Sequence, residues 1–200
     1  MIDSALVLEG PGVRLEPIER RHLIDLRKNC ADPVLWELVY GTNPFLTEDD
    51  TNEWVSDATA GGDRLAFAIV DRATNETIGS TRFADIQPEH RKLEIGWTFI
   101  AQRYWRTHVN TECKYLLLEY AFERWNAQRV QLKAEAINTR SRNAILRIGA
   151  TFEGTLRSFR IKPENGEIRD TSFYSIIAPE WPSVKKRLAE RLHTPVSSQS

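Results

Sequence analysis

Hydrophobic and polar residues follow two distinct patterns along this chain. Residues 13–18 and 130–136 alternate apolar and polar side chains, whereas residues 65–70 form a continuous apolar run. Strict alternation is typical of a strand with one buried face, and an uninterrupted run is typical of a strand buried on both faces. Together with the segments at 77–86 and 92–101, these patterns predict a sheet that begins as an antiparallel meander.

The clearest helical pattern occupies residues 111–124, where apolar residues form a helix-compatible stripe and Thr111 is the expected N-cap. The predicted strands at 92–101 and 130–136 flank it. A strand, a helix and a strand in succession predict a crossover connection and a parallel strand pair. The predicted fold class is therefore α/β (or α+β): a mixed, mostly antiparallel sheet with a central βαβ unit and flanking helices.

Further helices and a hairpin are expected around this unit. Thr47 followed by three acidic residues predicts a helix start, because Thr caps helices and acids favour the positive end of the helix dipole. Ser141 is expected to cap a short helix that Gly149 closes. The remaining predictions are a helix at 22–29, a hairpin of strands at 151–161 and 168–177, and a terminal helix at 181–192.

Length and charge limit the number of domains and the kinds of partner that the chain is expected to have. The 200 residues predict one domain over residues 1–193, followed by a small, polar and disordered tail at 194–200. Lys and Arg number 27 and Asp and Glu 28, so the balanced charge does not indicate a nucleic acid or membrane partner. Cys30 and Cys113 make no disulfide framework, and no metal-ligand spacing surrounds them. No segment has the pattern of a signal peptide or a membrane span, so a cytoplasmic protein is predicted.

The loop before the central helix carries candidate chemistry. It reads Trp-Arg-Thr-His-Val-Asn-Thr at residues 105–111. A loop between a strand and a helix N-terminus directs several backbone N–H groups, and the positive end of the helix dipole, at one place. We therefore expect an anion to bind there.

Three motifs resemble those of one enzyme family. They are Glu94-Ile95-Gly96-Trp97, the loop at 105–112, and Asn138-Thr139-Arg140-Ser141 followed by the run at 152–157. From residue 13 to about 177, the chain resembles the GNAT family of acetyl-CoA-dependent N-acetyltransferases. More narrowly, it resembles the RimJ/RimL-like branch, which contains the ribosomal-protein N-terminal acetyltransferases.

The loop departs from the family pattern at two positions. His108 stands where the family has a glycine, and Asn110 stands where it has a second small residue. Glycine is useful there because the backbone approaches phosphate closely and can require positive φ. His and Asn tolerate positive φ better than most residues, and Arg103, Arg106 and His108 offer charge to a phosphate.

The resemblance implies an enzyme of the acyltransferase class (EC 2.3.1) that transfers acetyl from acetyl-CoA directly to a primary amine in a ternary complex, without a metal. Glu94 is the implied general base, acting through water, and the alternative is an ion-paired or solvent-facing glutamate. Ile145 stands where the family often has a tyrosine that protonates the thiolate. In the RimJ/RimL-like branch a serine one helical turn earlier is the better analogue, so the resemblance implies Ser141 as the donor on the thiol side, and a plain N-cap is the alternative.

The resemblance also implies a cofactor site made largely of backbone. The strand end would hold the thioester, the loop amides would hold the pyrophosphate, and asparagines would bind the pantetheine arm. The residues concerned are Phe99, Ile100 and Ala101; Arg106, Thr107, His108, Val109, Asn110 and Thr111; and Asn138, with Ser141 and Asn143 on the same segment.

The acceptor amine is expected to be a small molecule or a protein N-terminus. Its candidate contacts are Trp36, Tyr40, Arg82 and Tyr174, for each of which a structural role is the alternative. Arg82 would attract an acidic or carboxylate-bearing acceptor. Two other functions are open at this point: a non-catalytic acyl-CoA-binding protein of the same fold, and an interaction module without a CoA site. A homodimer is a further hypothesis.

Overall fold

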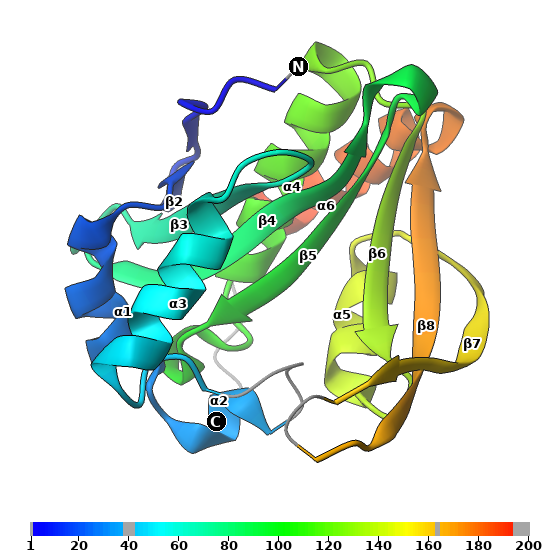
Figure 1. Ribbon diagram of the computed structural model, residues 1–200. Coiled ribbons are helices and arrows are strands. Elements are labelled where there is room, and N and C mark those ends of the chain that lie inside the picture. Colours follow the sequence, from blue (N-terminus) through cyan, green and yellow to red (C-terminus); the bar gives the residue numbers. More distant parts are fainter. Residues whose placement is uncertain (1, 38–42, 163–164, 194–200) are drawn as a thin grey trace, which may run out of the picture.

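The computed structural model describes residues 2–37, 43–162 and 165–193. Within these residues, eight strands form one sheet in the order β1-β2-β3-β4-β5-β6-β8-β7, and every neighbouring pair except β5 and β6 is antiparallel (Figure 1). The predicted mixed, mostly antiparallel sheet is thereby confirmed. The strands are β1 (Leu8–Glu9), β2 (Val13–Pro17), β3 (Leu65–Asp71), β4 (Thr77–Gln87), β5 (Lys92–Ile100), β6 (Arg129–Glu135), β7 (Thr151–Ile161) and β8 (Ile168–Ile177).

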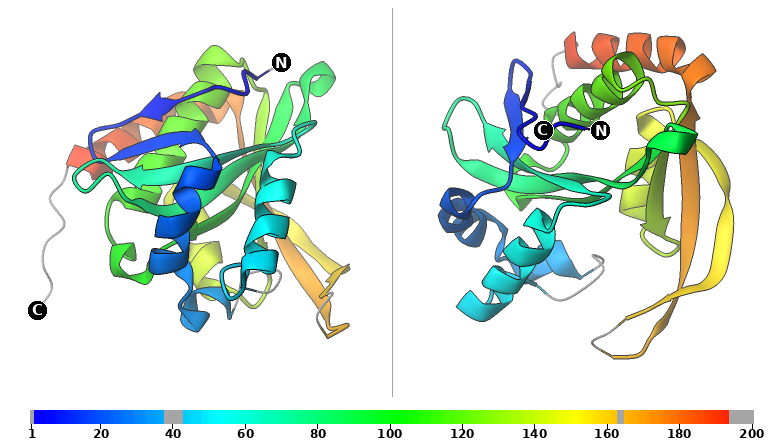
Figure 2. Two further views of the ribbon diagram at one scale, coloured as in Figure 1. Left: turned by 60° about the vertical axis from the view of Figure 1, so that its left-hand side comes forward. Right: turned by 45° about the horizontal axis from the view of Figure 1, so that its top comes forward.

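Helices cover both faces of the sheet (Figure 2). On one face lie α1 (Leu23–Cys30), α2 (Pro33–Trp36) and α3 (Glu48–Thr59). On the other lie α4 (Val109–Glu119), α5 (Thr139–Arg147) and α6 (Trp181–His193). Two hydrophobic clusters fill the two layers. Strand β3 supplies Phe67 and Ile69 to one cluster and Ala68 and Val70 to the other, which explains its continuous apolar run.

Two of the predicted helix caps are wrong, and one is confirmed. Thr47 accepts the Asp50 N–H at 3.1 Å, as expected for the start of α3. Thr111 lies inside α4, which begins two residues earlier. Ser141 lies inside α5, whose cap is Asn138; the Asn138 side-chain oxygen accepts the Ser141 N–H at 2.9 Å. Several cap-competent residues stand close together at both places, so local sequence alone does not select among them.

The parallel pairing of β5 and β6 is short. Three residue pairs connect the strands, the last joining Glu94 and Gln131, and the strands then diverge toward the lower end of Figure 1. Strand β5 also shifts register against β4 near Trp97, which has a φ of 48°. Such a bulge bends a strand away from its neighbour. The bend helps to open a gap in the middle of the sheet, on the carboxyl side of Glu94.

Candidate active site

A cavity of about 740 Å³ lies where β5 and β6 diverge. Its wall comes from these two strands, the loop after β5, α4, α5 and β8, with Leu35 of α2 and Arg160 of β7. Several predicted site residues line it: Glu94, Phe99, Ile100, Arg106, Asn110, Asn138, Ser141 and Asn143. Other predicted residues are not among its lining: Trp36, Arg82, Ala101, Thr107, His108, Val109, Thr111 and Tyr174. Tyr40 lies outside the described residues.

Glu94 is buried in the cavity wall beside a lysine. Its Oε2 lies 2.5 Å from the Lys133 Nζ and 3.5 Å from the Gln131 Nε2. Its Oε1 lies beside Gly96, where an added Cβ would come within 3.0 Å of that oxygen. Glycine at position 96 therefore leaves room for this carboxylate. Of the two roles considered for Glu94, the ion pair is present, and it orients the carboxylate within the cavity.

The loop after β5 differs from the predicted shape. Arg106 has the positive φ, at 64°, whereas His108 has a φ of −68°. The His108 ring points away from the cavity toward Glu112, with 3.6 Å between Nε2 and Oε2. Glu112 also accepts the N–H groups of Gly12 and Val13 at 2.8 and 3.0 Å. His108 thus lies against the N-terminal hairpin and leaves the cavity open.

The main chain of β5 offers fewer donors than predicted. Ala101 donates its N–H to the Ile78 carbonyl at 2.8 Å, so this amide is committed to β4 and is not a donor for a thioester. Along an antiparallel strand, successive N–H groups point to opposite sides. Ile100, which lines the cavity, therefore directs its N–H away from β4, toward the gap.

The α5 segment brings three predicted site residues to the opposite wall of the cavity: Asn138, Ser141 and Asn143. Asn138 is buried and uses its side-chain oxygen to cap α5. Ser141, one turn before Ile145, lines the cavity together with it. Because Asn138 is the cap, the plain N-cap alternative for Ser141 is wrong. The Arg140 guanidinium lies 3.9 Å from the Trp105 ring centroid, so a cation–π contact connects α5 to the loop after β5.

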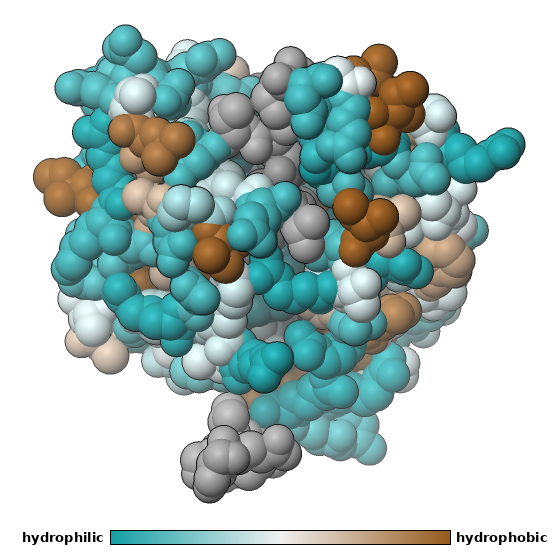
Figure 3. All heavy atoms as spheres, turned by 90° about the horizontal axis from the view of Figure 1, so that it is seen from below, coloured by the Kyte–Doolittle hydropathy of each residue, from teal (hydrophilic) through white to brown (hydrophobic). Residues whose placement is uncertain are grey.

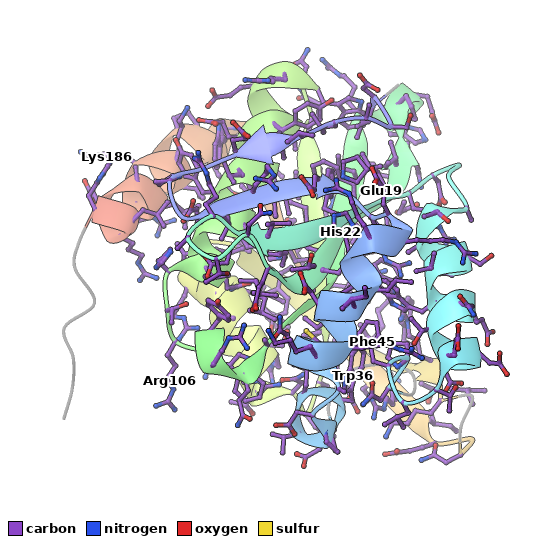
Figure 4. The ribbon with its side chains drawn as sticks, turned by 90° about the vertical axis from the view of Figure 1, so that its left-hand side faces the viewer. Glu19, His22, Trp36, Phe45, Arg106 and Lys186 are labelled. Carbon is purple, nitrogen blue, oxygen red and sulfur yellow. The ribbon has the colours of Figure 1, made fainter. Side chains whose placement is uncertain are left out.

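Three residues predicted to contact the acceptor amine lie in structural positions. Tyr174 is fully buried, and its hydroxyl accepts a hydrogen bond from the Arg142 Nε at 3.0 Å, so it is a core residue and not a substrate contact. Arg82 is buried and bonded to Asp57 at 2.6 Å. Trp36 packs against Phe45 and Phe99, and Figure 4 shows Trp36 and Phe45 side by side. Structural roles account for all three positions.

Sequence reasoning missed the charged groups that the fold brings together around the cavity. Lys133 and Glu135 on β6 pair with Glu94 and Arg169, and burial raises the pKa of Glu135. Lys114 on α4 is buried in the same wall. The polar positions of the alternating β6 pattern were a usable signal for Lys133 and Glu135. For Lys114, the usable signal was a lysine inside the apolar stripe of α4.

The cavity wall is strongly cationic. Two carboxylates, Glu94 and Glu135, stand among seven cationic side chains: Arg106, Lys114, Lys133, Arg140, Arg147, Arg160 and Arg169. The face seen from below, toward which β5 and β6 diverge, is mainly hydrophilic with separate hydrophobic patches (Figure 3). Such a wall favours an anionic ligand with several charges.

Comparison with known proteins identifies the family. The family model described as "Acetyltransferase (GNAT) domain" matches residues 13–151. The chain belongs to the GNAT acetyltransferase family. It is 30% identical over 115 residues to the uncharacterized N-acetyltransferase YoaA of Bacillus subtilis, a match that covers 58% of this chain and 63% of YoaA, just under two thirds of that protein. It is 26% identical over 132 residues to the uncharacterized N-acetyltransferase p20 of Bacillus licheniformis, covering 66% and 72% of the two chains.

A solved GNAT structure shares nearly the whole fold. The crystal structure of a GCN5-related N-acetyltransferase from Brucella melitensis superposes with a TM-score of 0.90 at 27% identity, covering 98% of this chain and 90% of the other. The predicted GNAT fold and the predicted class of enzyme, a GNAT-type acyltransferase, are confirmed. Within the described residues, no helix is both long and apolar enough to cross a membrane.

Proposed function

We propose that this GNAT enzyme uses acetyl-CoA and transfers the acetyl group directly to a primary amine. The observation that carries the proposal is the continuity of the cavity, which runs from the gap between β5 and β6 to the cationic loop before α4. Acetyl-CoA has a thin thioester arm and a charged phosphate end. A narrow opening in a sheet, continuing into a helix N-terminus and exposed arginines, suits both parts.

The cofactor's phosphates would meet the first turn of α4 and the side chains of Arg106 and Asn110. Arg140 and Arg147 on α5 supply further cations at this end. Asn138 would bind the pantetheine arm, and the Ile100 N–H would hold the thioester carbonyl. GNAT enzymes use acetyl-CoA in general, and assigning it to these residues is our proposal.

Glu94 is the proposed general base. A water molecule on the Oε1 side, beside Gly96, would relay the proton of the attacking amine to the carboxylate. Lys133 keeps that carboxylate oriented through Oε2. Ser141, on the opposite wall, would donate a hydrogen bond to the sulfur. Because the amine attacks the thioester directly, all reactants must occupy the cavity together.

The acceptor is proposed to be a protein N-terminus or a small amine, in keeping with a RimJ/RimL-like branch. YdaF of B. subtilis, whose name proposes ribosomal N-acetyltransferase activity, is 32% identical over 107 residues, or 54% of this chain and 57% of YdaF. RimJ from Mycobacterium smegmatis, solved with CoA-disulfide, has a TM-score of 0.76 at 23% identity. Spermidine N-acetyltransferase from Vibrio cholerae, solved with CoA and spermine, has a TM-score of 0.70 at 18% identity. The last two support the fold alone.

Thiol release with a panel of amines tests the proposal. Acetyl-CoA should raise the melting temperature, and peptides with a free N-terminus or polyamines should release CoA thiol. The matched control for each peptide is the same sequence with its N-terminus already acetylated, which should release none. Stabilisation without turnover on any amine would favour a non-catalytic acyl-CoA-binding protein. Failure to bind acetyl-CoA at millimolar concentration would favour an interaction module. The cytoplasmic location and the homodimer stay predictions.

A further inference from the structure

Lys114 occupies an unusual position for a lysine. It lies on α4, is 6% exposed, and directs its amine at β4 and β5. The Nζ lies 2.5 Å from the Thr98 Oγ1 and 3.4 Å from the Thr81 Oγ1, and these two hydroxyls lie 2.8 Å from each other. Thr98 follows the bulge at Trp97 in the diverging part of β5. Lys114 and Thr98 both line the cavity, so the amine lies at its wall.

The Lys114 amine has no counterion in the part of the chain that the structure describes, unlike the other buried cations of the site. Lys133 pairs with Glu94 and Arg169 pairs with Glu135, but within the described residues no carboxylate forms an ion pair with Lys114. Burying an ammonium without a counterion disfavours its charged form. Burial accordingly lowers the pKa of Lys114 to about 8.

The surroundings of Lys114 contain few groups that titrate near neutral pH. The Cys113 thiol on the same helix is fully buried, which raises its pKa to about 12. Glu112 is bonded to the N-terminal hairpin. From β4 and β5 the amine faces threonine hydroxyls, and α5 contributes the cations Arg140 and Arg147 to the cavity wall. Glu94 stands on the opposite face of β5 from the α4 layer, since its neighbours Leu93 and Ile95 are in that layer's core.

We propose that Lys114 is the acid that protonates the CoA thiolate as it leaves. The inference rests on the proposed function, because it requires the thioester in the gap beside Thr98. Ile145 has no proton to donate, and the Ser141 alcohol is a weaker acid than a thiol, so Ser141 alone cannot leave the sulfur protonated. An ordinary thiol has a pKa of about 8.5. A lysine that titrates close to this value is matched to the transfer.

The carbon–sulfur bond of the tetrahedral intermediate breaks, and its electron pair stays on sulfur. A proton moves from the Lys114 ammonium to the sulfur, which leaves as free thiol, and Lys114 becomes a neutral amine. The proton lost by the acceptor nitrogen leaves through Glu94 and water, and Lys114 regains a proton from solvent before the next turnover.

The kcat–pH profile of Lys114→Met tests this role. We expect wild-type kcat to fall as the pH rises above about 8, where the acid becomes deprotonated. Lys114→Met should lower kcat by roughly 100-fold or more and abolish this alkaline decline, with less than about a threefold change in the KM for acetyl-CoA. The control Lys186→Met, at an exposed position of α6, should leave the profile unchanged. A kcat for Lys114→Met within about threefold of wild type, or a persisting decline, would overturn the inference.

A second measurement needs neither an acceptor nor a variant. Ultraviolet absorbance reports the thiolate of CoA bound to the wild-type enzyme as the pH is raised. An ammonium beside the sulfur should shift thiolate formation to lower pH than in free CoA, and an unshifted titration would overturn the role of Lys114 while leaving the proposed function intact. If CoA does not bind at all, the proposed function itself fails and the inference fails with it.

Discussion

The two ends of the cavity hold positive charge in opposite ways. At the end formed by α5 and the loop before α4, Arg106, Arg140 and Arg147 are exposed, and within the described residues none of them forms an ion pair. At the end formed by β6 and β8, Lys133 and Arg169 are largely buried, and each is paired with a glutamate.

Exposure to solvent decides which of these cations need a counterion in the protein. Exposed guanidinium groups stay hydrated, so they need no protein partner and can bind an incoming phosphate. Charges removed from water need a counterion, because desolvation of an unpaired ion is costly. The exposed end is thus suited to hold the anionic cofactor, and the paired end is suited to chemistry that requires an oriented carboxylate. Lys114 is the exception, a buried cation that has no ion pair among the described residues.

Glu94→Gln would break the paired end and should have the largest effect. We expect kcat to fall by roughly 100- to 10,000-fold, because the amide cannot accept the proton. The substitution also leaves Lys133 without its counterion and should lower the melting temperature. The double variant Glu94→Gln, Lys133→Met removes both charges and should regain stability but not turnover. Restored turnover in the double variant would show that Glu94 is only structural.

Lys114→Met should stabilise the fold at neutral pH. The ordinary lysine value is 10.5 and the folded value is about 8, a difference worth on the order of 3 kcal/mol. Between these values the unfolded chain holds a proton that the folded chain has lost, so wild-type stability rises with pH across this window. The gain in free energy of unfolding from Lys114→Met, measured by denaturant unfolding, should be full below about pH 8 and should vanish near pH 10.5. An advantage independent of pH would show that packing, not charge, is responsible.

Arg140→Ala combined with Arg147→Ala would weaken the exposed end. We expect the KM for acetyl-CoA to rise by roughly tenfold or more, since hydrogen bonds to charged groups contribute about 1.5–3 kcal/mol. The KM for the amine should change little. Added salt should weaken cofactor binding in the wild type more than in this variant, because screening removes what the arginines contribute. Equal salt dependence in both proteins would place the phosphates elsewhere.

Asn138→Ala should have the smallest effect, and its matched control variant is Asn138→Asp. The change removes the α5 cap, at a cost of about 1 kcal/mol, and it should raise the KM for acetyl-CoA more than that for the amine. Asn138→Asp keeps an acceptor for the Ser141 N–H but loses the amide donor. If the aspartate variant keeps the wild-type melting temperature and still raises the cofactor KM, the amide contacts the pantetheine arm. An unchanged cofactor KM would remove Asn138 from the site.

Much of the architecture was predictable because local patterns encode it. The period of two in β6, the apolar run of β3, the Thr47 cap and the hairpin of β7 and β8 depend on neighbouring residues in the chain. The strand–helix–strand order predicts the parallel pair of β5 and β6 on general grounds. Three short motifs also sufficed to place the chain in its family. These features need no knowledge of which strands come together or how deeply each residue is buried.

The chemistry of the site depended on tertiary structure. Glu94 meets Lys133 only in the register that joins β5 to β6, and a shift by one residue would send each side chain to the other face. His108 points toward Glu112 because the N-terminal hairpin packs there. Burial lowers the pKa of Lys114 only because α4 packs its amine against β4 and β5, beside Thr81 and Thr98. Sequence determined the elements, whereas packing between distant segments determined which charges are buried, which are paired, and where the sheet opens.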